Sequence, residues 1–209
     1  MSANLLSASV GKKLGMAVTG ILLYGFLMAH LTGNLLLLKG DGGATFNAYA
    51  DFLTHHPLLV PAEIGLVALF ALHVYLAVIV SLENRQARPV AYQISRTVGG
   101  RTWASRTMIW TGLAVVVFLV LHIATFKYGD RGGGTLYDLV IGAFRTRLYA
   151  GAYLVAMVVL GFHLWHAFHS AFQTLGLSSR PRLRKLGIAL CILLAGGFAA
   201  IPAGVFLTR

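Results

Sequence analysis

Residues 148–174 read LYAGAYLVAMVVLGFHLWHAFHSAFQT, an apolar run that contains no aspartate, glutamate, lysine or arginine. An α-helix needs about 20 such residues to cross the hydrocarbon core of a bilayer. The run is continuously apolar rather than alternating, which favours a helix over a strand of a β-barrel. It therefore predicts a membrane-spanning helix, with three histidines near its end.

The rest of the chain has the composition of a membrane protein. Of its 209 residues, 57% are hydrophobic and 11% are charged, against roughly 25% charged residues in soluble domains. We expect an all-α integral membrane protein with one domain over 1–209 and five transmembrane helices. Besides 148–174, the expected spans are 14–38, 60–82, 108–126 and 186–207. The first run is too long for the apolar core of a signal peptide, and we expect it to be retained.

The distribution of basic residues predicts the orientation. Eleven of the 17 lysines and arginines lie before the first span or in the second and fourth connections. Cytoplasmic loops are enriched in such residues, so we expect a multi-pass protein of the inner (cytoplasmic) membrane with its N-terminus in the cytoplasm. The outer connections, GDGGATFNAYADF at 40–52 and YGDRGGGTLYD at 128–138, have the composition of ordinary loops.

The net charge of +11 does not indicate binding to nucleic acid, because the basic residues cluster in short loops between apolar runs. The basic connection 83–107 is either a membrane-surface anchor or a docking site for a soluble partner. Cys191 lies in an apolar run and is expected to be a small buried side chain. We expect no internal repeat and no nucleotide-binding glycine pattern.

Histidines inside the spans are the candidate functional residues. Six of the eight histidines lie in spans, and four consecutive spans carry at least one, whereas His55 and His56 lie in an outer loop. A polar ring at membrane depth needs a partner, and a hydrogen bond to a neighbouring helix is the simplest. Recurrence in four spans favours a shared purpose, and imidazole is a good axial ligand for haem iron.

The depth of each histidine predicts two pairs. At a rise of 1.5 Å per residue, His122 and His30 lie about 7 and 13 Å from the outer boundary, and His73 and His163 about 18 and 24 Å. A bundle of the first four helices with two stacked haems fits these depths. A haem with histidine at both axial positions transfers electrons. The pattern therefore predicts transmembrane electron transfer, with a quinone as the natural membrane-soluble partner.

Four segments resemble one known family. They are TGILLYGFLMAHLTGNLLLL at 19–38, HVYLAVIVSLENRQARPVAY at 73–92, RTMIWTGLAVVVFLVLHIATF at 106–126 and GFHLWHAFHSAFQTLGL at 161–177. In content and order they are similar to the succinate dehydrogenase/fumarate reductase cytochrome b subunits, in the single-subunit, five-helix, dihaem branch. The resemblance covers essentially the whole chain.

That resemblance implies a membrane anchor for a flavoprotein subunit and an iron–sulfur subunit on the cytoplasmic face. It is compatible with a higher oligomer of the complex. Dicarboxylate chemistry, a step of the tricarboxylic acid cycle, would lie on the partner, so this chain holds no catalytic residue. Two b-type haems would pass electrons to quinone, which in this branch is usually menaquinone. His30 and His122 would ligate the iron of the distal haem, and His73 and His163 that of the proximal haem.

Several finer assignments follow. Within 161–177, His163 is preferred over His166 as ligand, with its ring N–H bonded to a backbone carbonyl one turn back, whereas His169 points about 120° away. Glu63 is either a proton relay near the distal haem or a carboxylate favoured by a helix N-terminus. Arginines in the basic connection would dock the iron–sulfur subunit or bind haem propionates; they are Arg85, Arg88, Arg96, Arg101 and Arg106.

Two other classes are weighed against this interpretation. A quinol-oxidising cytochrome would carry two well-separated ligands on each of two helices, which this chain does not. A haem-free structural anchor or transporter would use its histidines to pair helices, and transporters more typically show broken helices or acidic residues at the midplane.

Overall fold

The computed structural model describes residues 9–86, 103–177 and 181–208, without the side chains of 103–106, and every regular element in these ranges is helical. The long helices are α1 (Ser9–Asn34, continued by the 3-10 turn η1, Leu35–Leu38), α3 (Leu59–Gln86), α4 (Trp103–Phe126), α6 (Arg147–Thr174) and α7 (Pro181–Thr208). Two short helices, α2 (Ala44–Thr54) and α5 (Leu136–Arg145), join α1 to α3 and α4 to α6.

Five helices of the described chain are long and apolar enough to cross a membrane, which confirms the predicted spans. The helices extend beyond several predicted limits; α3, for example, continues through Arg85 to Gln86. Helices do not stop where apolar residues stop, because polar side chains can extend into water while the backbone stays hydrogen-bonded. The protein is thus an all-helical, multi-pass membrane protein.

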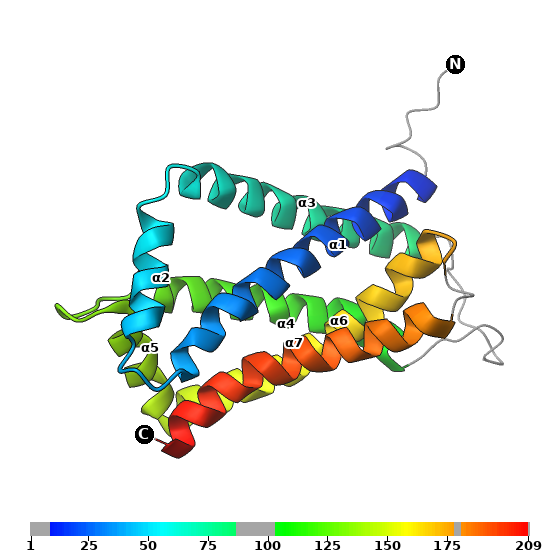
Figure 1. Ribbon diagram of the computed structural model, residues 1–209. Helices are drawn as coiled ribbons and strands as arrows, with labels where there is room; N and C mark the ends of the chain where they lie inside the picture. The colour runs from blue at the N-terminus through cyan, green and yellow to red at the C-terminus, as the bar shows by residue number, and fades with distance from the viewer. Residues whose placement is uncertain (1–8, 87–102, 178–180, 209) are drawn as a thin grey trace.

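The long helices run roughly along one axis, and α2 and α5 lie together at one end (Figure 1). The start of α1, the end of α3 and the start of α4 lie at the opposite end. The helix ends that flank the first outer connection therefore lie on one side of the bundle, and the end of α3 and the start of α4 lie on the other. Which side faces the cytoplasm stays a prediction.

The helix pairs that pack closely are α6 with α7, α1 with α3, α4 with α6, and α1 with α6. Small residues permit close approach of the helices: a Cβ atom placed on Gly161 would lie 3.0 Å from the Cβ of Ala195. Glycine and alanine commonly allow such contacts between membrane helices. Cys191 on α7 is buried, as predicted, and its Sγ lies 3.4 Å from the hydroxyl oxygen of Tyr24 on α1.

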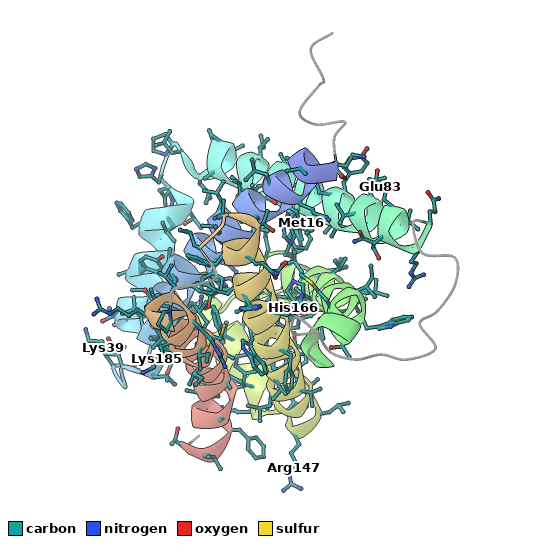
Figure 2. The ribbon with its side chains drawn as sticks, turned by 90° about the vertical axis from the view of Figure 1, so that its right-hand side faces the viewer. Met16, Lys39, Glu83, Arg147, His166 and Lys185 are labelled. Atoms are coloured by element: carbon teal, nitrogen blue, oxygen red, sulfur yellow. The ribbon has the colours of Figure 1, made fainter. Side chains whose placement is uncertain are left out.

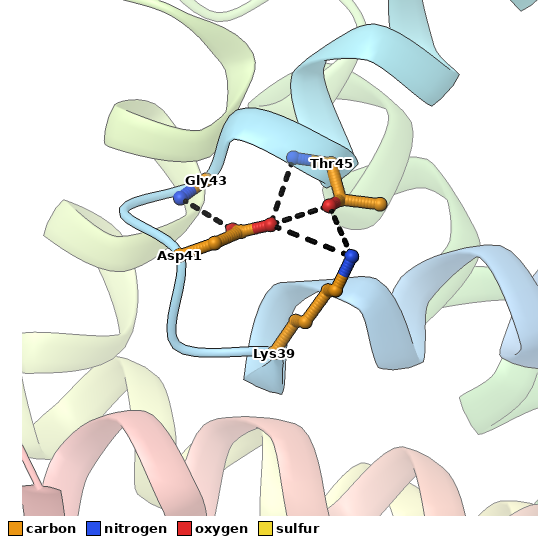
Figure 3. Close-up of polar contacts among 4 residues, drawn as sticks. All are labelled: Lys39, Asp41, Gly43 and Thr45. Atoms are coloured by element: carbon orange, nitrogen blue, oxygen red, sulfur yellow. Dashed lines mark hydrogen bonds and ion pairs between the residues drawn. The ribbon is translucent and has the colours of Figure 1, made fainter.

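The first outer connection is not an ordinary loop, so that prediction is wrong there, because Ala44–Thr54 form α2. In the second, the residues before α5 are irregular, as predicted, and only the last three, from Leu136, are helical. At the start of α2, the Asp41 carboxylate accepts hydrogen bonds from the backbone N–H groups of Gly43 and Thr45, both at 3.1 Å, and from the Thr45 hydroxyl (Figure 3). Lys39 Nζ lies 3.9 Å from the same carboxylate. The polar residues that suggested a loop instead satisfy the first N–H groups of a helix.

The start of α5 is fixed in a related way. Thr135 and Asp138 form a capping box, in which each side chain accepts a hydrogen bond from the other residue's backbone N–H. Hydrogen bonds from Thr135 hold the pKa of Asp138 below its ordinary value. One face of α5 is then buried against the end of the bundle, through Tyr137, Val140, Ile141 and Phe144.

Candidate functional site

His30 on α1 and His122 on α4 form one pair of adjacent histidines. Their ring centroids are 5.8 Å apart and the ring planes are almost perpendicular, at 85°. Each ring also contacts the phenylalanine one helical turn before it: Phe26 stacks on His30 at 5.4 Å, and Phe118 lies 5.7 Å from His122. Two helices that are distant in sequence therefore bring two imidazoles together between aromatic rings.

The Nδ1 atoms of this outer pair are engaged by neighbours. His122 Nδ1 lies 3.1 Å from the hydroxyl oxygen of Tyr153 on α6. His30 Nδ1 lies 3.3 Å from Nδ2 of Asn34, which also donates to the His30 carbonyl at 2.7 Å. Tyr153 is buried and packs against Phe144 with a centroid distance of 4.9 Å. The two rings of the outer pair are thus contacted by different helices: His122 by Tyr153 on α6, and His30 by Asn34 on its own helix α1.

His73 on α3 and His163 on α6 are engaged by threonine hydroxyls. His73 Nδ1 lies 3.0 Å from Thr19 Oγ1 on α1, and His163 Nδ1 lies 3.4 Å from Thr111 Oγ1 on α4. The partner of His163 is therefore a hydroxyl on another helix and not the predicted backbone carbonyl one turn back. This difference arises because α4 and α6 pack closely at this level.

A glycine follows each of these threonines and faces the same histidine ring. A Cβ atom on Gly20 would lie 3.3 Å from His73 Cε1, and a Cβ atom on Gly112 would lie 3.3 Å from His163 Cε1. Any larger residue would press on the ring. The two glycines let each imidazole lie directly against the neighbouring helix.

The four histidines share one arrangement. All are half-buried, all use Nδ1 for a contact with a neighbouring side chain, and within the described residues no hydrogen bond is recorded at any Nε2. The helices that bear each pair, α1 with α4 and α3 with α6, are not among the closely packed pairs, whereas α1 packs on α3 and α6, and α4 on α6. Each pair thus comes from helices that face each other diagonally across the bundle.

This arrangement fits the donor set of a haem with two axial histidines. A ligating imidazole binds metal through one ring nitrogen and donates a hydrogen bond from the other. The hydroxyl partners of His73, His122 and His163 can accept such a bond, whereas Asn34 Nδ2 beside His30 can only donate. Within the described residues, no group of three or more histidine, cysteine or acidic side chains could hold a metal ion by itself. A pair of histidine rings can supply only the two axial ligands of an iron ion. The remaining ligands would come from the haem macrocycle.

A cavity of about 290 Å³ lies beside His73, between α1 and the later turns of α6. Its lining is largely apolar, with Met16, Gly20 and Tyr24 contributed by α1. Lys13, Ser170 and Thr174 also line it. The neighbouring Lys12 forms an ion pair with Glu83, so only one of the two consecutive lysines is directed to this cavity. The cavity suits an apolar body that carries a negative group at one edge.

The other histidines are placed differently. His169 is exposed and lines a small space of about 40 Å³ between α6 and α7, together with Arg184. His166 lies toward the middle of the bundle in the end-on view, whereas Arg147 and Glu83 lie at its edge (Figure 2). His55 and His56 are at the end of α2, where their Nδ1 atoms bond to local backbone groups.

The carboxylate and arginine candidates are only partly located. Glu63 Oε1 lies 2.5 Å from Lys127 Nζ, so this side chain is an ion-pair partner at the start of α3. Arg85 lies in the last turn of α3. Arg88, Arg96 and Arg101 lie outside the described residues, as does the side chain of Arg106.

Sequence reasoning missed the threonines, the glycines and the repeat that relates them. TGILLYGFLMAH at 19–30 and TGLAVVVFLVLH at 111–122 share threonine, glycine, phenylalanine and histidine at the same spacing. The helices repeat as well, since α1–α2–α3 and α4–α5–α6 are each a span, a short helix and a span. The prediction that the chain has no internal repeat is therefore wrong; aligning the spans by their histidines would have found it.

Comparison of the chain with models of protein families, with curated proteins and with solved structures finds no match. The fold defines a multi-pass, all-helical membrane protein with five span-length helices in its described part.

Proposed function

We propose that this chain is the dihaem cytochrome b membrane-anchor subunit of a succinate:quinone oxidoreductase. The observation that carries the proposal is the placement of His30 beside His122, and of His73 and His163 on diagonal helices, with each Nδ1 engaged by a neighbouring side chain. The resemblance of residues 19–38, 73–92, 106–126 and 161–177 to that family supplies the kind of complex.

In this proposal His30 and His122 are the axial ligands of a distal b-type haem, and His73 and His163 those of a proximal one. The haems supply one-electron transfer along the bundle axis. The chain's own residues bind, orient and enclose them. Phe26 and Phe118 flank the outer pair, and Gly20 and Gly112 make room for the inner rings.

Lys13 is the residue that we assign to a propionate of the proximal haem. It lines the cavity that also contains His73, and it lies two helical turns from Gly20 toward the end of the bundle. An ammonium group pairs favourably with a carboxylate at such a boundary. This assignment differs from the arginines of the basic connection, which remain candidates for docking the partner subunits.

The rest of the proposal concerns the complex. The flavoprotein and iron–sulfur subunits would bind on the cytoplasmic side, at the end of the bundle that carries the basic connections. Dicarboxylate chemistry would take place on the flavoprotein, and quinone, preferentially menaquinone, would react from the inner (cytoplasmic) membrane. The basic residues at this end, Lys12, Lys13, Arg85, Arg182, Arg184 and Lys185 among them, support docking of soluble partners.

A haem-free anchor or transporter is the competing function, since hydrogen bonds such as His122–Tyr153 also join helices. Haem content of the purified chain separates the two. We expect two b-type haems per chain. His30→Ala and His122→Ala should each lose the distal haem, and His73→Ala and His163→Ala should each lose the proximal haem. His55→Ala should retain both. A reduced-minus-oxidised spectrum without b-type bands in the wild type would rule out the proposal.

A further inference from the structure

The paired Thr–Gly sequences on α1 and α4 do more than fill space. Thr19 and Thr111 each lie eleven residues before a candidate outer ligand on their own helix. Each nevertheless contacts an inner histidine on another helix, His73 or His163. One short motif therefore contributes a ring to one pair and a hydroxyl to the other, and it does so twice in the chain.

The direction of each hydrogen bond follows from the donors available. Thr19 Oγ1 lies 2.9 Å from the carbonyl oxygen of Gly15 and 3.1 Å from that of Met16. Carbonyl oxygens only accept, and a threonine hydroxyl has one hydrogen. The Thr19 hydroxyl therefore donates to its own helix backbone, and its oxygen accepts from Nδ1–H of His73.

The same reasoning applies to the second copy. Thr111 Oγ1 donates to the carbonyl oxygen of Met108 at 3.0 Å, which leaves its lone pairs for Nδ1–H of His163 at 3.4 Å. With the proton on Nδ1, the neutral imidazole carries its free lone pair on Nε2. Both inner rings are thus in the form that binds a metal through Nε2.

The outer pair is supported by different groups. Asn34 offers an N–H donor to His30 Nδ1, and Tyr153 offers a hydroxyl that can donate or accept at His122. The Asn34 donor favours the Nε2–H tautomer of His30, and the Tyr153 hydroxyl fixes neither tautomer of His122, unlike the backbone-bonded threonines of the inner pair. The two pairs therefore differ in how firmly the metal-binding form is set before any ligand arrives.

We infer that Thr19 and Thr111 are positioning residues of the inner site, which hold His73 and His163 in the Nδ1–H tautomer with Nε2 free for haem iron. Gly20 and Gly112 complete the arrangement by allowing each ring to lie against the helix that bears its threonine. The inference rests on the proposed function, because it assigns these threonines to the proximal haem.

The acceptor on Nδ1–H also sets the basicity of the ligand. A hydrogen bond from a ligating imidazole to an acceptor makes it a stronger donor to the metal, and a stronger donor favours the oxidised iron. Removing the hydroxyl should therefore raise the midpoint potential of the proximal haem. Loss of such a supporting partner commonly weakens metal binding by about 10- to 100-fold.

The test compares threonine variants on the purified full-length chain. Thr19→Val and Thr111→Val should raise the midpoint potential and change the low-spin spectrum of the inner haem only, with weaker retention of that haem. Thr19→Ser keeps a hydroxyl and should therefore retain the wild-type midpoint potential and spectrum of the inner haem. Thr32→Val is the matched control, because Thr32 lies on the same helix, donates to the Met28 carbonyl at 2.9 Å and is exposed.

The inference is overturned if Thr19→Val behaves like Thr32→Val, or if it changes the outer haem instead. A wild type without haem would defeat the proposed function alone. In that case ¹⁵N spectra of histidine-labelled apoprotein still decide the role of the threonines: His73 should carry its proton on Nδ1 in the wild type and lose that preference in Thr19→Val. An unchanged tautomer in the variant would refute the positioning role.

Discussion

Lys127 Nζ, one residue beyond α4, lies 2.5 Å from Glu63 Oε1 in the first turns of α3. Because α3 and α4 are not among the closely packed helix pairs, this ion pair joins them at the end of the bundle that carries α2 and α5. At the other end Lys12 on α1 pairs with Glu83 on α3. Helix α3 is therefore tied to the bundle by one ion pair near each end.

The Lys127–Glu63 pair should make a modest contribution to stability. Both side chains are partly exposed, at 42% and 38%, and such pairs typically contribute about 0.2–1 kcal/mol. A double-mutant cycle with Lys127→Met and Glu63→Gln, followed by thermal unfolding in detergent, should give a coupling energy in that range that decreases with salt. A coupling of zero, with loss of quinone reduction in Glu63→Gln alone, would favour the proton-relay role for Glu63.

His163 rather than His166 should be the ligand on α6. His163 contacts Thr111 and lies against Gly112, whereas His166 forms no hydrogen bond with any other residue that the structure describes. His163→Ala should abolish the low-spin signal of the proximal haem and leave the distal one, while His166→Ala should keep both. If His166→Ala loses that signal and His163→Ala retains it, the assignment is wrong.

Tyr153→Phe should perturb the outer pair without disturbing the aromatic packing. It removes the hydroxyl beside His122 Nδ1 but keeps the ring that packs on Phe144. We expect a stability loss of about 1 kcal/mol, the usual value of one hydrogen bond, and an altered spectrum of the distal haem. Tyr24→Phe is the control, since the Tyr24 hydroxyl lies 3.4 Å from Cys191 Sγ rather than beside a histidine. Equal spectral changes in both variants would contradict a specific role for Tyr153.

Adjacent glycines on α7 should respond differently to alanine. A Cβ atom on Gly197 would lie 2.7 Å from Cδ2 of Leu31, a side chain that is 4% exposed, whereas a Cβ atom on Gly196 meets nothing within 4 Å. Overpacking costs about 1–3 kcal/mol, so Gly197→Ala should be less stable than Gly196→Ala by about that amount. Equal unfolding temperatures of the two variants would show that Leu31 moves aside freely.

The two short helices should loosen in acid. Hydrogen bonding to Thr45 lowers the pKa of Asp41, and hydrogen bonding to Thr135 lowers that of Asp138, from an ordinary value of 3.8. A lowered pKa means that each carboxylate stabilises its helix start fully above the ordinary value, and that this stabilisation is lost as the pH falls through the lowered one. The protection of backbone amides in α2 and α5, with exchange rates corrected for their intrinsic pH dependence, should therefore decrease as the pH falls below about 3.8.

The matching variants test that cause. Asp41→Asn and Asp138→Asn should each remove the acid dependence of amide protection in its own short helix and leave the other unchanged. Asp130→Asn is a suitable control, because Asp130 accepts a hydrogen bond from Gly132 N–H outside any helix. Continued acid loosening of α5 in Asp138→Asn would show that another group is responsible.

The parts of the fold that could be predicted from sequence are those governed by long-range hydropathy. Five runs of about 20 apolar residues predict five spans whatever their partners are. Helices α2 and α5 could not be found in this way, because Asp41 and Thr135 act as helix caps only when the following residues can bury a face. Phe46 and Tyr137 do so against the end of the bundle, and that surface exists only in the folded protein.

The site shows a similar division. Histidines at membrane depth can be recognised from sequence as candidate functional residues, because a polar ring is energetically costly there. The helical rise per residue was enough to group His30 with His122. Thr19 and Gly20 gave no such signal, since threonine and glycine are common in membrane helices and become significant only through the ring of His73. The cavity reaching Lys13 was likewise outside the reach of spacing arguments, because α1 and α6 form it together.

The recurrence of span, short helix and span bears on how such a chain could arise. The two units are α1–α2–α3 and α4–α5–α6. His30 in the first unit corresponds to His122 in the second, and His73 corresponds to His163, so each pair takes one histidine from each unit. A polypeptide with only the first unit, α1–α2–α3, would hold half of each pair and would complete both as a homodimer. Gene duplication and fusion of such an ancestor, with α7 added behind it, would yield this chain. The differing partners Asn34 and Tyr153 then mark where the two copies have diverged.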